Sequence, residues 1–262
     1  MLCRADRAGL YCCDPHVTRR SPGGPRLSHR PAHRHGAQER ICHATPHRGK
    51  EPSYTRWSSP DGWIKTIPYQ EATGRLRKLY DRIKGPDDNV DNIMLAHSLR
   101  PHTMEGHMAI YKYVLHHTGN ELPKWLLELV GVWVSLLNRC DYCVEHHFAG
   151  LQRLLDDPPR AAAMRAALTA QELDAACFTP ADRAALAYAQ RLTLEPSRLT
   201  QADLTPLTAA GYSDGTILEI NQVCAYFNYA NRTVLGLGIN TQGDLLGLSP
   251  GNSSDPTDWN HR

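Results

Sequence analysis

The sequence predicts an all-α fold, a compact bundle of helices. From Trp63 onward, apolar residues recur with helical spacing in several segments, and Pro or Gly interrupts the chain between them. We find no alternating apolar run typical of a strand, and no internal repeat. Hydrophobic residues make up 41% of the chain and charged residues 21%, so a packed core can form.

Capping residues and breakers mark the ends of the expected helices. Thr179 is a predicted N-cap with Pro180 at the first helical position, and Ser213 caps the last long helix. The "DDPP" stretch at 156–159 is a stop signal for the helix before it. The expected helices cover 67–83, two segments of 91–117 that meet at Pro101, 123–138, 141–155, 179–193, 199–211 and 213–234.

Composition divides the chain into an extension over 1–60, a helical domain over 61–245 and a flexible C-terminal tail over 246–262. The extension holds eleven Lys and Arg against four Asp and Glu, six of the fourteen His, and no regular periodicity. Such a segment buries too little apolar surface to fold alone, so it is expected to be a disordered tail or the product of an upstream start codon. A basic or His-rich binding arm is the alternative.

Charge and hydropathy exclude two classes of partner. The formal net charge is +2, and the surplus lies in 1–60, so the remaining chain is mildly acidic and unsuited to nucleic acid. The longest apolar run, 125–137, is too short to span a bilayer and contains Glu128. We find no secretory signal, which favours the cytoplasm and free thiols. Four of the eight cysteines lie in 1–60, so a disulfide framework is not expected.

The stretch "NRCDYCVEHH" (138–147) carries the chemistry. Cys140 and Cys143 are one helical turn apart, so one thiol can resolve an oxidised partner. Cys143 and His147 share a helix face at i and i+4, so His147 can accept the thiol proton. Cys140 is expected at the helix start, where the dipole favours an anion. Glu128 lies in an apolar helix, where a carboxylate needs a partner, and we expect that partner to be a histidine.

Two other interpretations of the cysteines remain open. A C-x-x-C pair is half of many zinc sites, but no second pair follows and the adjacent His146 and His147 point in different directions. Buried cysteines can also serve only as small core residues. Cys177 and Cys224, each alone on an apolar face, are interpreted in this way.

The residues carry a family resemblance. Glu128, eleven residues, Cys140-x-x-Cys143, three residues and His147 resemble the signature of AhpD-like alkylhydroperoxidases, within the carboxymuconolactone decarboxylase superfamily. The segments "IPYQEATGRLRKLYDRI" and "NQVCAYFNYANRTVLGLGI" are similar to its peroxidase-related branch. The resemblance covers about Trp63 to Gly243.

The resemblance implies a thiol peroxidase or disulfide reductase. Cys143 would be the peroxidatic thiol and Cys140 the resolving thiol, while His147 and Glu128 would form a proton relay. The substrate would be hydrogen peroxide or an organic hydroperoxide, the reductant an external thiol system, and no metal or other cofactor is implied. The bundle would assemble into a homo-oligomer, a trimer or hexamer.

One departure from the family pattern concerns the residue before the second cysteine. Well-known members have a histidine there, and here it is Tyr142, a poor base near neutral pH. The relay is therefore expected to be shorter or to use His146.

Other polar residues give weaker expectations. Asn228 and Asn231 either make helix-end contacts at a subunit interface or line the active-site pocket. Five histidines without mutual ligand spacing are interpreted as surface or interface residues: His97, His102, His107, His116 and His117. Two further functions stay open: a cofactor-free enzyme like carboxymuconolactone decarboxylase, and a zinc-binding or redox-sensing oligomer.

Overall fold

The computed structural model of the chain describes residues 62–255 and 257–261, and the structural findings below concern these residues. The predicted extension over 1–60 lies outside them. In the described residues the secondary structure is helical, without strands, and one isolated β-bridge pairs Pro250 with His261. The all-α prediction is confirmed for this part of the chain. None of its helices is long and apolar enough to cross a membrane.

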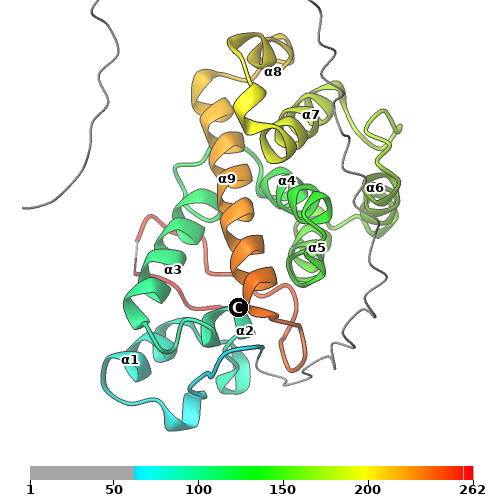
Figure 1. Cartoon of the computed structure of the whole chain (residues 1–262). Helices are drawn as coiled ribbons and strands as arrows, with labels where there is room; N and C mark the ends of the chain where they lie inside the picture. The colour runs from blue at the N-terminus through cyan, green and yellow to red at the C-terminus, as the bar shows by residue number, and fades with distance from the viewer. Residues whose placement is uncertain (1–61, 256, 262) are drawn as a thin grey trace, which may run out of the picture. The chain divides into compact units, whose positions relative to one another are not determined.

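The helices are numbered in chain order (Figure 1). The α-helices are α1 (Gly74–Ile83), α2 (Asn92–Leu95), α3 (Pro101–Leu115), α4 (Lys124–Leu137), α5 (Asp141–Leu155), α6 (Pro158–Ala170), α7 (Pro180–Leu194), α8 (Thr205–Ala209) and α9 (Asp214–Leu237). Short 3-10 turns are η1 (Tyr69–Glu71), η2 (Pro86–Asp88), η3 (Pro196–Arg198) and η4 (Gln201–Leu204).

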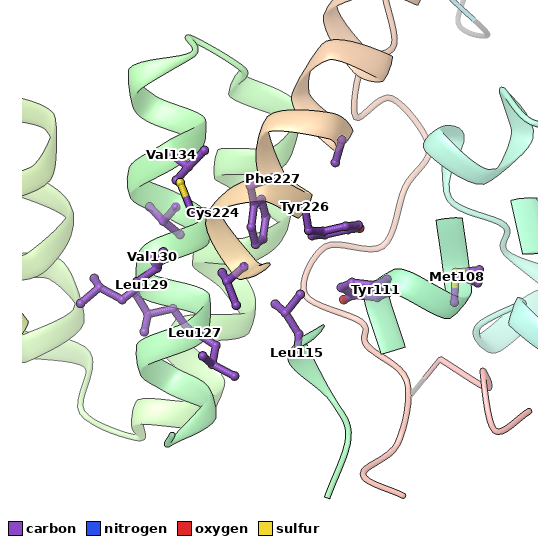
Figure 2. Close-up of a cluster of buried hydrophobic side chains, with 14 of the residues drawn as sticks. Met108, Tyr111, Leu115, Leu127, Leu129, Val130, Val134, Cys224, Tyr226 and Phe227 are labelled. Carbon is purple, nitrogen blue, oxygen red and sulfur yellow. The ribbon is translucent and has the colours of Figure 1, made fainter. Parts of the chain in front are cut away.

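Helix α4 is at the centre of the core. It is apolar around most of its circumference, as a helix with neighbours on several sides must be, and it packs against α5, α7 and α9. In Figure 1 the long helix α9 runs between α3 on one side and α4, α5 and α7 on the other. Figure 2 shows Phe227 at the contact between α9 and α4, with Val130 and Val134 of α4 nearby.

A glycine allows α4 and α9 to approach closely. A Cβ atom on Gly131 would lie 2.2 Å from the ring of Phe227, which is fully buried. Any larger residue at position 131 would push the two helices apart. Because α4 carries Glu128 and α9 carries part of the pocket wall, this contact helps to fix the site.

Capping explains where the sequence prediction holds and where it is wrong. Thr179 forms the predicted cap, with a reciprocal capping box to Asp182, and Ser213 accepts a bond from the Thr216 amide. The "DDPP" stretch was predicted only as a stop, but it also starts α6. Asp157 is the N-cap, accepting from the Arg160 amide, and Pro158 occupies the first helical position, where no amide is needed.

Three other predicted helices are shorter in the structure. The first of the two expected over 91–117 is reduced to the four residues of α2 (Asn92–Leu95). The segment 67–83 becomes the turn η1 followed by α1, because Gly74 adopts a left-handed conformation (φ +55°) at the start of that helix. The segment 199–211 divides into η4 and α8, with Pro206 near the start of the second piece.

The C-terminal segment packs onto the helices, whereas the sequence predicts a flexible tail over 246–262. Trp259 and His261 are buried, and the Arg82 guanidinium lies 4.0 Å from the centroid of the Trp259 ring. Fully buried Lys112 of α3 donates to the Gly251 carbonyl and to the Ser253 hydroxyl. A buried ammonium requires such acceptors, so these bonds hold the segment in place.

Candidate functional site

The two cysteines of the C-x-x-C motif lie where α4 gives way to α5. Arg139 adopts a left-handed conformation (φ +56°), and the Cys140 amide donates to the Ser135 carbonyl at 2.9 Å. This tight turn makes Cys140 the N-cap of α5, as predicted, and places Cys143 one turn into the helix. Both thiols are free, with exposed fractions of 0% and 2%.

The pKa values of the two thiols are shifted in opposite directions. A hydrogen bond from the Cys143 thiol lowers the pKa of Cys140, and burial opposes this shift. The same bond, together with burial, raises the pKa of Cys143 well above its ordinary value. The first negative charge of the pair therefore forms on Cys140 at the positive end of α5, whereas the sequence favours an activated Cys143.

The buried carboxylate of α4 has the predicted histidine partner. Glu128 is 3% exposed, and its Oε2 lies 2.7 Å from Nδ1 of His147. This contact fixes the ring orientation and, because a carboxylate only accepts, places a proton on Nδ1. The other ring nitrogen, Nε2, is then the atom of His147 that can accept a proton.

A partly open cavity of about 40 Å³ brings five of the predicted residues together: Cys143, His147, Glu128, Tyr142 and His146. Cys140 is not part of its wall. On the same measure a water needs about 10–15 Å³, so the cavity suits a molecule of a few non-hydrogen atoms. Further wall residues come from α3, α9 and the C-terminal segment, among them Met108, Tyr111, Tyr226, Leu248 and His261.

Tyr111 and Tyr226 form an aromatic wall. Their rings stack with centroids 5.6 Å apart, and Figure 2 shows them side by side, one from α3 and one from α9. Burial raises the pKa of both phenols well above the ordinary value. They therefore act as neutral hydroxyl groups and not as bases.

Tyr142 and His146 belong to a second cluster organised by Asp244. The Tyr142 hydroxyl donates to Asp244 Oδ2 at 2.6 Å, and His146 Nε2 lies 3.1 Å from the same oxygen. The Asn92 amide also donates to the carboxylate. Sequence reasoning missed Asp244, which lies about a hundred residues from its partners in a loop without any recognisable signal. Tyr142 is thus held as a donor to Asp244, and burial raises its pKa well above the ordinary value.

The two asparagines of α9 have different surroundings. Asn231 is fully buried, donates to Ser135 and accepts from Asn138, and its side chain favours the thiolate form of both cysteines of the motif, which is a minor, lowering contribution to the pKa of each. Asn228 donates instead to Thr193 and to the backbone of Cys224. The structure therefore brings Asn231, but not Asn228, to the dithiol.

The interpretation of five histidines as surface residues is wrong for three of them. His97, His107 and His116 are buried, whereas His102 is exposed and His117 is half-buried. Their places in the helical pattern hid this, because α3 is packed on more than one side. Cys224 is buried as expected, and Cys177 is half-buried. Among the described residues, we find no group of three or more His, Cys, Asp or Glu side chains that could hold a metal ion.

A comparison with protein families supplies the context for this geometry. The family "Carboxymuconolactone decarboxylase" matches residues 101–191, which include the C-x-x-C motif, Glu128 and both adjacent histidines. Residues 101–191 form a carboxymuconolactone decarboxylase family domain. The superfamily predicted from the sequence is thereby confirmed.

Individual proteins are also similar to this chain. The protein YdfG of Bacillus subtilis (strain 168) is 22% identical over 142 residues, which is 54% of this chain and 91% of that protein. A solved structure described as an alkylhydroperoxidase AhpD core, a peroxidase-related protein from Ralstonia eutropha JMP134, has a TM-score of 0.62 at 23% identity. The match covers 72% of this chain and 98% of that one.

Two more solved structures share the fold. A peroxidase-related protein from Silicibacter sp. TM1040 has a TM-score of 0.60 at 22% identity, covering 70% of this chain and 92% of that one. The debrominase Bmp8, in complex with 2,3,4-tribromopyrrole, has a TM-score of 0.53 at 17% identity, covering 70% and 92%. At these identities the likeness establishes the AhpD-like helical fold.

Proposed function

We propose that this protein is a thiol-dependent hydroperoxide reductase. The observation that carries the proposal is the shared cavity, because Cys143, His147 and Glu128 all line it. A second thiol, Cys140, is hydrogen-bonded to Cys143 and is not among the lining residues. A nucleophile at a small cavity, a base with its orienting carboxylate and a resolving thiol are the groups that peroxide reduction by cysteine needs.

The catalytic cycle follows from these positions. His147 accepts the proton of Cys143, and the Cys143 thiolate attacks the terminal oxygen of the hydroperoxide. The O–O bond breaks, and the leaving alkoxide takes the proton back from His147 and departs as an alcohol. The Cys140 thiolate then attacks the sulfur of the sulfenic acid, releasing hydroxide, which becomes water with a solvent proton. An external dithiol reduces the disulfide and restores both thiols.

The unequal thiol pair supports this division of roles. Cys140 has the lowered pKa, so a larger fraction of it is thiolate when the sulfenic acid forms. Cys143 has the raised pKa, so it needs His147 to accept its proton before it can attack. Glu128 stabilises the imidazolium formed in this step.

Intact mass after one equivalent of an organic hydroperoxide tests the proposal. Reduced wild-type protein is expected to lose two hydrogens as the disulfide forms. The Cys140→Ser variant is expected to gain one oxygen, because its sulfenic acid cannot be resolved. Cys224→Ser, a buried thiol outside the site, serves as the control and should behave as wild type. If the masses of wild type and Cys140→Ser both stay unchanged, the proposal is rejected.

An acid–base enzyme like carboxymuconolactone decarboxylase is the alternative. The second cluster favours it, because His146 with Asp244 and the half-buried Asp91, whose pKa is raised by desolvation, supply acid and base groups without any thiol. Replacing both cysteines by serine separates the two functions. Activity on a small lactone carboxylic acid that survives this double change would support the alternative.

We also propose that the protein assembles into a trimer or hexamer. Apolar side chains remain exposed on neighbouring helices, with Ile110 and Tyr113 on α3 and Tyr229 and Leu235 on α9. A contact between copies would remove this surface from water. Light scattering of the full chain measures the assembly directly, and a monomer at micromolar concentration would contradict it.

A further inference from the structure

Two buried histidines beside the cavity carry ring nitrogens that the proposed reaction does not use. His107 of α3 lines the cavity and is 2% exposed, and His97, in the turn after α2, is 8% exposed. Their ring centroids are 5.1 Å apart. Within the described part of the chain, neither Nδ1 of His107 nor Nε2 of His97 has a hydrogen-bond partner. Buried polar atoms are rarely left unpaired, so each of these two nitrogens is expected to have a polar partner.

The bonding of Thr103 determines the tautomer of His97. The Thr103 hydroxyl lies 2.8 Å from the Arg100 carbonyl and 2.8 Å from Nδ1 of His97. Only one arrangement puts a proton in both contacts: the hydroxyl donates to the carbonyl, and Nδ1–H of His97 donates to the hydroxyl. Nε2 of His97 is then an acceptor without a donor.

The bonding of Tyr226 determines the tautomer of His107 in the same way. The Tyr226 hydroxyl lies 3.2 Å from Nε2 of His107, its one hydrogen-bond partner among the described residues. The hydroxyl therefore donates its proton to Nε2, which leaves the ring hydrogen on Nδ1. Burial lowers the pKa of His107 to about 3, so the ring stays neutral. Nδ1–H of His107 is a donor without an acceptor.

The pair thus offers one donor and one acceptor close together. A hydroxyl group matches both, because its oxygen can accept from His107 while its hydrogen is donated to His97. A carbonyl or an ether oxygen can satisfy only His107, and a methyl group satisfies neither. Apolar Met94 and Met108 complete this part of the wall and favour the carbon atoms of an organic molecule over bulk water.

We propose that His97 and His107 form a subsite for a hydroxyl group of a small organic substrate held in the cavity. The proposal rests on the proposed function for its substrate class, which becomes a small hydroperoxide that carries a separate alcohol group. The subsite itself is a binding feature and does not depend on the thiol chemistry.

Matched substrates and variants test the subsite by kinetics. 2-Hydroxyethyl hydroperoxide and propyl hydroperoxide differ by a hydroxyl in place of a methyl group. Wild type is expected to prefer the first by about tenfold in kcat/KM, the worth of a well-placed hydrogen bond, and chiefly through KM. His107→Gln and His97→Asn remove the two nitrogens that have no partner among the described residues and should abolish the preference. His107→Asn and His97→Gln keep a polar atom at those positions and should retain part of it.

A binding measurement keeps the test independent of turnover. Ring ¹⁵N spectra of the reduced protein are recorded with ethanol and with its isomer dimethyl ether, which accepts but cannot donate. Ethanol is expected to shift Nε2 of His97 and Nδ1 of His107, and the ether at most the latter. If neither shifts, water alone occupies the subsite and the proposal is overturned. If ethanol binds but hydroperoxides are not reduced, the subsite stands and the proposed function fails.

Discussion

Two adjacent histidines of α5 have carboxylate partners of very different origin. His147 bonds to Glu128, which is carried by the central helix α4 and buried in the core. His146 bonds to Asp244, which lies in the loop after α9 and is held there by the Asn92 amide and Tyr142. Both carboxylates are shielded from water, yet one pair is built by helix packing and the other by loop closure.

The difference indicates separate duties. A partner on a packed helix is positioned within small tolerances, which suits proton transfer. A partner on a loop links distant segments, so its bonds hold the loop after α9 against α5 and the start of α2. We therefore expect changes to the first pair to act on turnover and changes to the second to act on stability.

The largest expected effect comes from Glu128→Gln. Glutamine keeps the size of the side chain but cannot stabilise the His147 imidazolium, so kcat/KM for a hydroperoxide should fall about 100-fold. Steady-state kinetics with a saturating thiol reductant measure this. Glu145→Gln, an exposed change on α5 at the Arg165 ion pair, is the matched control and should be silent. Activity of Glu128→Gln within threefold of wild type would remove Glu128 from the relay.

An intermediate effect is expected for Asp244→Asn. The amide loses the charge that holds His146 and accepts less strongly from Tyr142, so the free energy of unfolding should fall by about 2 kcal/mol. Urea denaturation measures the loss, with exposed Asp174→Asn as the control. Turnover at a temperature where the variant is folded should change less than tenfold. A larger fall in turnover than that of Glu128→Gln would reverse the duties assigned to the two pairs.

The smallest expected effect concerns the thiol pair beside these histidines. The Cys143 hydrogen bond is the main cause that lowers the pKa of Cys140, so Cys143→Ala should raise it. Below that pKa the thiolate fraction of Cys140 falls, so the variant should show less thiolate than wild type at neutral pH. The thiolate ultraviolet absorbance, taken as a difference from Cys140→Ala, measures this. An unchanged midpoint would mean that Cys143 does not donate to Cys140.

The sequence was sufficient to predict the part of the site that depends on local helix geometry. Helical spacing was sufficient to place Cys143 and His147 on one face, and the cost of burying a charge was sufficient to expect a partner for Glu128. Asp244 was out of reach, because its pairing depends on how a loop returns over α5. The burial of His107 was missed since a helix packed on several sides has no clear polar face.

The helices, too, were predicted well where local signals determine them and poorly where long-range contacts do. Thr179 and Ser213 each cap one helix, and both helix starts were predicted correctly. The "DDPP" stretch ends one helix and starts another, and only its role as a stop was predicted. The C-terminal segment over 246–262 was expected to be flexible, because no helical pattern continues into it. Its place in the structure depends on a few long-range contacts to α1 and α3, above all those of Trp259 and Lys112.

Because the C-terminal segment packs beside the cavity, an affinity tag at this end of the chain would affect measurements at the site. His261 belongs to the cavity wall, so any residues fused after position 262 would begin one residue from the compartment where substrate is proposed to bind. A polyhistidine tag at that end would bring extra imidazoles close to the cavity. Their signals would overlap with the ring ¹⁵N spectra, and their titration would complicate the thiolate measurement. Preparations intended for kinetics should carry a cleavable tag at the other end of the chain.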